Sequence, residues 1–573
     1  MQNLYTSQRF SRDELIYSAL IFLILFLLYF PGLSYPFMLQ WDDAVFVVSN
    51  PHLAFTFENL KLYFTKPFQD LYTPLTMVSL MIDHAISALS ATLYHIHNLL
   101  LHICASLLFF FILRKFKVRP LLAFISSLLW ALNPQKIESV IWITERKDVL
   151  SGALALGSFL LFIRSAEKKK LPILSSILGI LALLAKPSVL PLPGVMTVYL
   201  ITVWGKRHSL KEYARILLLP VCSFLLFVLL SAHITAQTFP GVFEWRFPVW
   251  FYNILWYPFT AIFPTVHPFY PLYLGDIRPY IPIYILAPIT ALLLVFWAKK
   301  VKLSTAKITG FLLVTGGLTV PVLGIIVYTY YDQADRYNYL VSLGVWAFIA
   351  CIAERTLREY PALSKYLNYL FISAAIVYFV LSWQYLPYWE KCEYLFARCL
   401  EDTRPSNVMF YDNGAVAAYA SGNHQLLQAI SDRMIRDHKA YKDAEDQYFS
   451  GLAYGLHAAI IRKDYTGAMP YYQKLDSMYK TKGGLKKYYW PYFFHNMAIV
   501  AAQTGDYGKA KNFLHIFFRI HDRKTHNFQI YYNALALKAQ LENDEKTLFA
   551  VLREMVKYDP ALSCFTKLEK KPE

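Results

Sequence analysis

The sequence predicts an all-α protein in which a polytopic bundle of membrane helices is followed by a domain of α-helical repeats. Apolar residues make up 56% of the 573 residues and charged residues only 17%, and the mean hydropathy is +0.34. The apolar residues form blocks close to the roughly 20 residues that span a bilayer. Near Tyr385 the sequence changes to mixed polar and aromatic residues, which places a boundary at Leu386-Pro387. We therefore expect a membrane domain in residues 1–386 and a repeat domain in residues 387–573.

Eleven apolar stretches are candidate spans, some of them short enough to be tilted, broken or packed inside the bundle. They lie near residues 15–29, 94–113, 121–132, 149–163, 173–184, 189–204, 216–230, 281–297, 308–328, 339–353 and 367–383. Residues 251–264 are also apolar, but a twelfth span there would turn Lys299-Lys300 outward. This stretch is therefore predicted to be an external or re-entrant helix.

Basic residues gather in alternate connections, which fixes the expected orientation. Examples are Arg114-Lys115, Lys206-Arg207, Lys299-Lys300 and Arg355. By the positive-inside rule these connections and the N-terminus, with Arg9, lie in the cytoplasm, and the odd number of spans puts the repeat domain outside. The formal charge of +17 is explained by this topology and a basic tail, so no nucleic-acid partner is needed.

Two adjacent carboxylates, Asp42 and Asp43, follow the first span on the external side. Acidic residues at this position can meet a lipid-borne and a water-borne substrate together, although a solvated turn or helix cap would use the same residues. The external stretch of residues 35–93 mixes apolar and polar positions and predicts one or two amphipathic helices. Pro74 marks a turn or the first turn of a helix there.

Other charged residues lie beside apolar helices on the same side, namely Glu138, Arg146, Lys147, Asp148, Asp335 and Arg336. Such residues need ionic partners or an aqueous cavity, so we expect a shared external cavity. Interfacial salt bridges are the alternative for Arg146, Lys147 and Asp148. Trp142 is interpreted as part of an aromatic belt or as a sugar-stacking residue.

A metal site is not indicated by the histidines or cysteines. His97 and His102 are five residues apart, about 140° around a helix, so they do not share one face. Structural hydrogen bonds are the favoured role for both, with active-site polar groups as the alternative. The sequence contains no CxxC or HExxH pattern, which argues against structural zinc. A divalent ion at the external site stays open.

The tail contains a degenerate repeat. Similar turn sequences recur at intervals of roughly 40 residues, each between two helical patterns: Gly422-Asn423-His424, Lys463-Asp464-Tyr465, Gly505-Asp506-Tyr507 and Asn543-Asp544-Glu545. Helical-hairpin arrays of this kind form concave surfaces that grip extended peptides, although a packing or oligomerisation module is equally compatible.

Several ordered motifs resemble a known family. They are Trp41-Asp42-Asp43, Tyr72-Thr73-Pro74-Leu75-Thr76, His97-Asn98-Leu99-Leu100-Leu101-His102, Glu138-Ser139-Val140, Glu145-Arg146-Lys147-Asp148-Val149-Leu150, Ala185-Lys186-Pro187 and Ala334-Asp335-Arg336-Tyr337-Asn338. Together they resemble the transmembrane tetratricopeptide-repeat O-mannosyltransferases and their bacterial relatives. The chain departs from the family at Asn133-Pro134, where a His-Pro pair is usual, so no role is carried over to that position.

The resemblance implies a C-superfamily glycosyltransferase fold and a sugar donor linked to polyprenyl phosphate. It implies an acidic base in the first external loop, here Asp43, with Asp42 orienting a substrate. Cations for the lipid phosphate would be Arg336, Lys186, Arg146 and Lys147, with Glu138, His97 and His102 in support. The acceptor would be a protein or peptide held by the repeats outside a bacterial inner membrane. A glycolipid-modifying transferase and a non-catalytic membrane scaffold are the alternatives.

Overall fold

A computed structural model describes the protein at residues 11–69, 71–204, 208–235, 242–243, 246–265, 281–323, 326–327, 333–402, 408–440, 444–481, 493–520 and 528–556. The chain divides into two compact units, Met1–Asn407 and Val408–Glu573. The sequence boundary after Leu386 falls within the first unit. The basic residues Arg9, Lys206 and Arg207, which are predicted to face the cytoplasm, lie outside the described residues.

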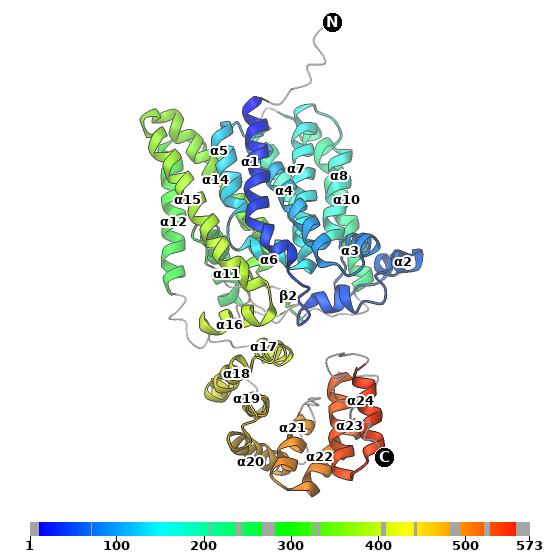
Figure 1. The fold of residues 1–573 in the computed structure, drawn as a ribbon. Helices are drawn as coiled ribbons and strands as arrows, with labels where there is room; N and C mark the ends of the chain where they lie inside the picture. Colours follow the sequence, from blue (N-terminus) through cyan, green and yellow to red (C-terminus); the bar gives the residue numbers. More distant parts are fainter. Residues whose placement is uncertain are drawn as a thin grey trace. The chain divides into compact units, whose positions relative to one another are not determined.

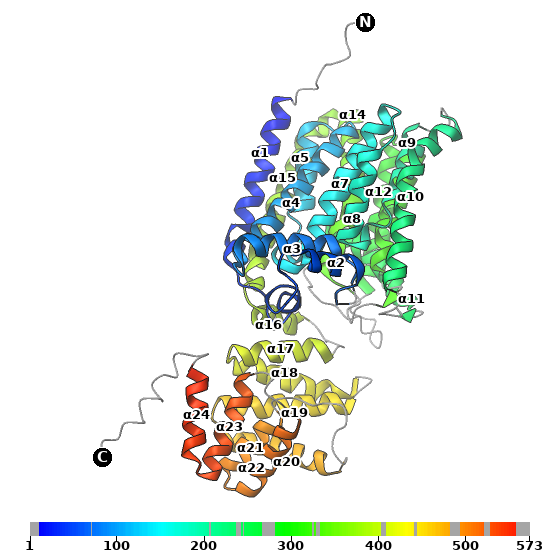
Figure 2. The ribbon, with the colours of Figure 1, turned by 90° about the vertical axis from the view of Figure 1, so that its right-hand side faces the viewer.

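The first unit is a bundle of long helices that run side by side (Figures 1 and 2). Its main helices are α1 (Arg12–Tyr29), α4 (Ala91–Lys115), α5 (Pro120–Ala131), α7 (Arg146–Glu167), α8 (Ile173–Ala185), α9 (Leu192–Trp204), α10 (Leu210–Thr235), α12 (Ile281–Lys300), α13 (Thr305–Thr319), α14 (Asn338–Glu359) and α15 (Ser364–Tyr385). Each predicted span overlaps one of these helices, but the span predicted at 308–328 is too long: α13 ends at Thr319, and Ile326–Val327 form a short strand. Among the described residues nine helical segments are long and apolar enough to cross a membrane, while α5 and α8 are shorter. The prediction of an all-α polytopic membrane protein is confirmed.

Burial distinguishes central from peripheral helices. In the most apolar part of α14 and α7, 78% and 72% of the residues are buried, whereas the corresponding value is 17% for α12 and α15. Apolar side chains that remain exposed on a long helix are suited to lipid. The two central helices therefore offer a rigid frame, and both begin at the end of the bundle where the charged residues predicted to be external lie.

Shorter elements cover that end of the bundle. The stretch of residues 35–93 forms α2 (Phe57–Thr65) and α3 (Pro74–Ser87), in line with the one or two helices predicted there, and both lie across the long helices in Figure 2. Pro74 occupies the first turn of α3, where its missing N–H costs no hydrogen bond. Further helices of this unit are α6 (Lys136–Ile141), α11 (Phe247–Ile262) and α16 (Cys392–Asp402). The named strands of the described chain are two residues long, β1 (Val242–Phe243) and β2 (Ile326–Val327), and pair antiparallel.

Helix α11 occupies the apolar stretch that was predicted to be external or re-entrant. It has 16 residues and is not among the segments long enough to span the membrane. Its buried residues Val249 and Tyr257 pack in one cluster with Ile283 of α12 and Val341 of α14. The helix is therefore anchored on the bundle by apolar contacts.

The second unit is built from helical hairpins. Its helices are α17 (Val408–Ala420), α18 (His424–Asp437), α19 (Ala444–Ile461), α20 (Tyr465–Thr481), α21 (Phe493–Gln503), α22 (Tyr507–Ile520), α23 (Phe528–Glu542) and α24 (Glu545–Val556). The four repeated turns connect consecutive pairs of these helices, and each has a residue with positive φ: Gly422, Lys463, Gly505 and Asn543. This left-handed position ends the first helix of each pair.

Candidate functional site

The adjacent carboxylates Asp42 and Asp43 have opposite environments. The residue Asp43 is 1% exposed, and its carboxylate accepts hydrogen bonds from the backbone N–H groups of Met38 and Thr144, both at 3.0 Å. The side chain of Asp42 is 43% exposed and lies 3.7 Å from the ammonium of Lys147. Asp43 as the base stays a prediction; the exposure of Asp42 makes its carboxylate the one of the two that a substrate hydroxyl reaches from solvent.

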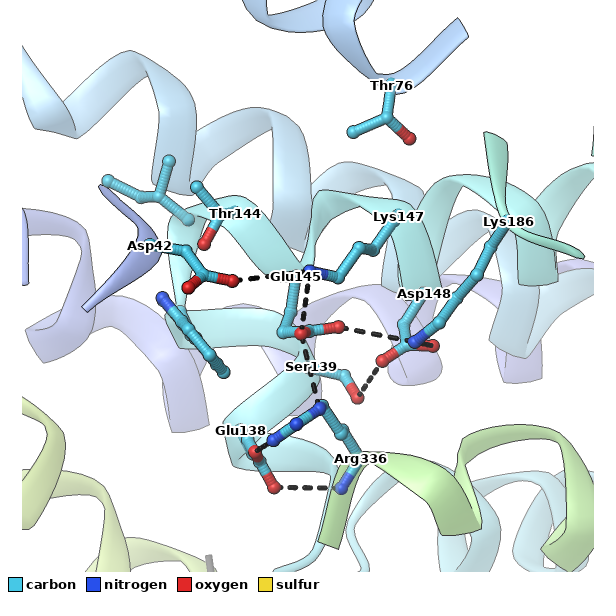
Figure 3. A network of polar contacts seen from close by, with 12 residues as sticks. Asp42, Thr76, Glu138, Ser139, Thr144, Glu145, Lys147, Asp148, Lys186 and Arg336 are labelled. Atoms are coloured by element: carbon cyan, nitrogen blue, oxygen red, sulfur yellow. Dashed lines mark hydrogen bonds and ion pairs between the residues drawn. The ribbon is translucent and has the colours of Figure 1, made fainter. Parts of the chain in front are cut away.

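Glu145 is the centre of a buried ion-pair network at this end of the bundle (Figure 3). Its carboxylate lies 3.1 Å from Lys147, 3.3 Å from Lys186 and 3.3 Å from Arg336. These partners come from α7, from the turn after α8 and from the segment before α14. One carboxylate thus gathers three of the four cations that the sequence predicts for an anionic ligand.

Lys186 has a second partner, the carboxylate of Asp148 at 2.5 Å. The lysine follows the last residue of α8, and the carbonyl of that residue, Ala185, accepts a 3.0 Å hydrogen bond from Thr76 of α3. The crosswise helix α3 therefore holds the backbone that presents Lys186. The lysine side chain is 16% exposed, against 7% for Arg336.

Arg336 is the most completely paired of the three cations. Its guanidinium forms an ion pair with Glu138, and its backbone N–H donates to the same carboxylate at 2.8 Å. The guanidinium also lies 5.3 Å from the centre of the Trp142 ring. Trp142 is 3% exposed and packs edge-on against Trp41, with ring centres 5.4 Å apart. It is thus a core residue of the site and not part of an exposed aromatic belt.

Arg146 lies outside this network, although it is next to Glu145 and Lys147 in sequence. Its guanidinium donates to Asp83 of α3 at 2.5 Å and to the Tyr94 carbonyl at 2.9 Å. It also donates to the side chain of Asn98 in α4. Because Arg146 is 1% exposed and its donors are directed at these acceptors, its expected role in phosphate binding does not fit the structure. It ties α3 and α4 to the start of α7.

The two histidines predicted as supporting residues lie in different places. His97 pairs with Asp83 and so joins the group around Arg146. His102 is fully buried; its Nδ1 lies 2.9 Å from the Tyr339 hydroxyl and its Nε2 3.2 Å from the Ala131 carbonyl. Both rings therefore make hydrogen bonds that fix helices relative to one another.

Burial shifts the pKa values of charged groups outside the spans. It raises the pKa of Asp43 to about 7, although backbone N–H groups favour the ionised form. It also raises the pKa of Glu138 to about 7, against the effect of Arg336. Burial would lower the pKa of Lys186, but Asp148 and Glu145 outweigh it and raise that pKa. Lys186 therefore stays charged at neutral pH, as binding of an anion requires.

A metal centre finds no support in the described side chains, which contain no group of three or more His, Cys, Asp and Glu residues placed to hold an ion. The carboxylates of Glu145, Asp148 and Glu138 all face lysine or arginine side chains. Anions paired in this way have their charge already balanced by the protein.

Glu145 and Asp83 were not among the residues selected from the sequence. Glu145 lies in a charged motif beside Arg146 and Lys147, which the sequence did indicate as site residues. Its three ion pairs, seen only in the folded chain, identify it as the centre of the network. Asp83 is an acidic residue in the apolar helix α3. A buried acid on such a helix requires a partner, so the position of Asp83 in the sequence could have predicted an ion pair.

The fold and these ion pairs define an integral membrane protein with a polar site at one end of its helices. A stretch of 94 residues, 16% of the chain, is 31% identical to protein O-mannosyl-transferase TMTC3 of Homo sapiens and covers 10% of it. A stretch of 142 residues, 22% of the chain, is 32% identical to protein O-mannosyl-transferase TMTC1 of Mus musculus and covers 15% of it. No protein-family model and no solved structure matches the chain. The matches, which span a small part of each relative, support a distant relation to these proteins.

Proposed function

We propose that the protein is a membrane glycosyltransferase that moves a sugar, mannose or a similar one, from a polyprenyl-phosphate carrier to a serine or threonine hydroxyl of a protein. The observation that carries the proposal is the exposed carboxylate of Asp42, 3.7 Å from Lys147 and next to the network around Glu145. A base and cations at the membrane surface are the groups that such a transfer needs. The names of the two relatives support the same class of reaction.

Asp42 would act as the general base. The acceptor hydroxyl oxygen forms a bond to the anomeric carbon while the bond from that carbon to the phosphate oxygen breaks, which inverts the configuration. The hydroxyl proton moves to Asp42, and the electron pair of the broken bond stays on the lipid phosphate. Asp43 holds the loop in place through the backbone N–H groups of Met38 and Thr144.

Lys147 and Lys186 would meet the negative charge that develops on the phosphate. Both ammonium groups lie near Glu145, and cations that are fixed before the reaction lose little energy to rearrangement. Arg336, with Glu138, would fix Glu145 from the opposite side and so position both lysines. This places Arg336 in a positioning role, in contrast to the direct donor contact expected from the sequence.

The proposal also assigns a membrane orientation and roles to the hairpin unit and to α11. The bundle would have a C-superfamily fold in a bacterial inner membrane, with the N-terminus in the cytoplasm and the site outside. The hairpin unit would be a tetratricopeptide-like array that presents the acceptor protein. Helix α11 would cover the carrier lipid like a lid.

The test is sugar transfer by the purified full-length protein from polyprenyl-phosphate mannose to a Ser/Thr-rich acceptor protein. We expect Asp42→Asn to lower the rate by about 100-fold or more, as the loss of a general base does, without a change in melting temperature. Asp43→Asn should lower the melting temperature as well as the rate. Glu58→Gln, an exposed acid of the same external stretch, is the control and should keep full activity.

Full transfer by Asp42→Asn would exclude Asp42 as the base. Transfer to a lipid acceptor in place of the protein would identify a glycolipid-modifying enzyme. If the protein transfers sugar from no carrier but still binds a partner protein, it is a non-catalytic membrane scaffold.

A further inference from the structure

A cavity lies inside the first unit, and neither Asp42 nor Glu145 lines it. It has a volume of about 420 Å³ and is lined by residues of α4, α7, α9, α13 and α14. This volume is within the roughly 300–1,000 Å³ typical of ligand sites. Its walls are mainly apolar, with side chains such as Phe159, Val198, Val314, Leu318 and Leu343. A hydrocarbon chain is the ligand that such walls favour.

The charged residues of the lining are all at one end. They are Lys115, Lys117, Glu167 and Lys307, and they lie at the ends of α4 and α7 and the beginning of α13. Lys115 pairs with Glu167 at 2.7 Å. Lys117 and Lys307 are exposed and, among the described side chains, they form no ion pair. The cavity thus combines an apolar interior with two available cations at one mouth.

The length of the cavity fits one leaflet of a bilayer. Along α13 its lining extends from Lys307 to Leu318, a distance of about 16 Å at the rise of an α-helix. This is about half of the ~30 Å hydrocarbon core, the depth that a fatty acyl chain reaches. Val203 of α9 both lines the cavity and is 55% exposed, so the cavity borders the surface that faces lipid.

The opposite end of the cavity has a different character. Val189, Leu192, Leu318 and Leu340 line it, and they offer no cation to a phosphate. A lipid phosphate bound at Lys186 would therefore sit outside this lining. The distribution of charge favours a headgroup at the lysine mouth and a chain that extends inward.

We propose that this cavity binds an acyl chain of an anionic glycerophospholipid from the leaflet at the lysine end, with the headgroup phosphate at Lys117 and Lys307. The site is separate from the transfer chemistry and does not depend on it. Its ligand is a structural lipid of the bundle, held by apolar contacts along the chain and by two cations at the phosphate.

The experiment measures the melting temperature of the full-length protein in detergent after addition of phosphatidylglycerol, phosphatidylcholine or polyprenyl phosphate. We expect phosphatidylglycerol to raise it by a few degrees more than phosphatidylcholine does. The double variant Lys117→Ala/Lys307→Ala should lose this difference. Val314→Trp, which fills the cavity, should lose the shift altogether, while the control Lys302→Ala, an exposed lysine at the same end, should behave like wild type.

Lipids that copurify with the protein give a second measurement if Val314→Trp does not fold. Mass spectrometry should find severalfold less phosphatidylglycerol on the double lysine variant than on wild type or Lys302→Ala. Equal shifts with the two phospholipids, or no effect of the lysine variants, would overturn the proposal. The proposal would also be overturned if only polyprenyl phosphate raised the melting temperature and Val314→Trp removed that shift. The cavity would then bind the carrier lipid and not a phospholipid.

Discussion

Arg336 and Glu138 are buried partners whose charges depend on each other. The residues are 7% and 0% exposed, and removal of one member of a buried ion pair costs about 3–5 kcal/mol because the other charge is left uncompensated. We therefore expect Arg336→Met to lower the free energy of unfolding by about that amount. The double variant Arg336→Met/Glu138→Leu should recover a large part of the loss. Thermal unfolding of the single and double variants in detergent measures the coupling.

If the stability loss of the double variant equals the sum of the losses in Arg336→Met and Glu138→Leu, the two residues do not act as a pair. The ion pair between Arg336 and Glu145 is retained in Glu138→Leu, so that single variant separates this ion pair from the one with Glu138. It should destabilise the protein less than Arg336→Met does.

Asp43 makes the stability of the protein depend on pH. Its pKa is raised by burial to about 7 in the folded protein, against about 3.9 in an unfolded chain. Between these values the folded protein binds more protons than the unfolded chain, so stability falls as pH rises from about 4 to 7. A single group of this kind contributes up to about 1.4 kcal/mol per pH unit.

Asp43→Asn should therefore show a shallower fall in melting temperature between pH 5 and pH 7 than wild type, because asparagine resembles the protonated acid and does not ionise. Glu58→Gln is the matched control and should keep the wild-type slope, because this exposed acid is not among the groups that shift the pKa of Asp43. Glu138, whose pKa burial also raises to about 7, contributes a slope of the same sign in all three proteins. Identical slopes in wild type and Asp43→Asn would contradict the assignment to Asp43.

At the scale of helices, the contact between α7 and α14 holds together the beginnings of these two helices, near which Lys147 and Arg336 lie. A Cβ at Gly152 of α7 would lie 2.6 Å from the ring of Tyr339, three residues after Arg336. The Tyr339 hydroxyl is hydrogen-bonded to His102, so the ring cannot move without a further loss. The glycine therefore permits a close approach of the two central helices.

Gly152→Ala should lower the free energy of unfolding by about 1–3 kcal/mol, the usual cost of overpacking, and should reduce transfer through displacement of Arg336. Gly194→Ala in α9 is the control, because a Cβ there meets nothing within 4 Å. Alanine should be neutral or slightly stabilising at that position, since glycine is a weak helix former. Melting temperatures and transfer rates of the two variants check this, and equal behaviour would exclude the proposed role of the contact.

Helix positions were predictable because they depend on local sequence. The external stretch gave α2 and α3, with Pro74 in the first turn, and the repeated tail turns gave four hairpins. The re-entrant candidate formed α11, a helix of 16 residues. Its contacts with α12 and α14 could not be predicted, because no periodicity in a helix specifies which neighbour it packs against.

At the scale of the whole molecule, the hairpin unit Val408–Glu573 is where we expect an acceptor protein to bind. Within it, a Cβ at Gly455 would lie 2.5 Å from the Tyr471 ring and 2.7 Å from the Ser431 hydroxyl. Gly455→Ala should therefore disturb the packing of α18, α19 and α20. We expect it to lower transfer to a folded acceptor protein severalfold and to leave transfer to a short acceptor peptide unchanged.

The control for this unit is Gly508→Ala in α22, where the nearest atom is 3.8 Å from the added Cβ. It should transfer sugar to both acceptors at the wild-type rate. Rates that fall equally for protein and peptide in Gly455→Ala would indicate that the hairpins do not select the acceptor.

The sequence by itself determined the membrane class, the helical segments, the hairpin repeats and several residues of the site, because hydrophobic blocks, turns and charge placement are local properties. It did not single out Glu145 or Asp83. The tertiary structure decided their roles. Asp43 is buried because its carboxylate meets the backbone of Thr144, 101 positions away, and Arg336 is neutralised by Glu138, 198 positions away. Arg146 lies outside the network around Glu145 because its guanidinium pairs with Asp83 of α3. Exposure and charge pairing depend on contacts between distant segments, and only the folded chain brings those segments together.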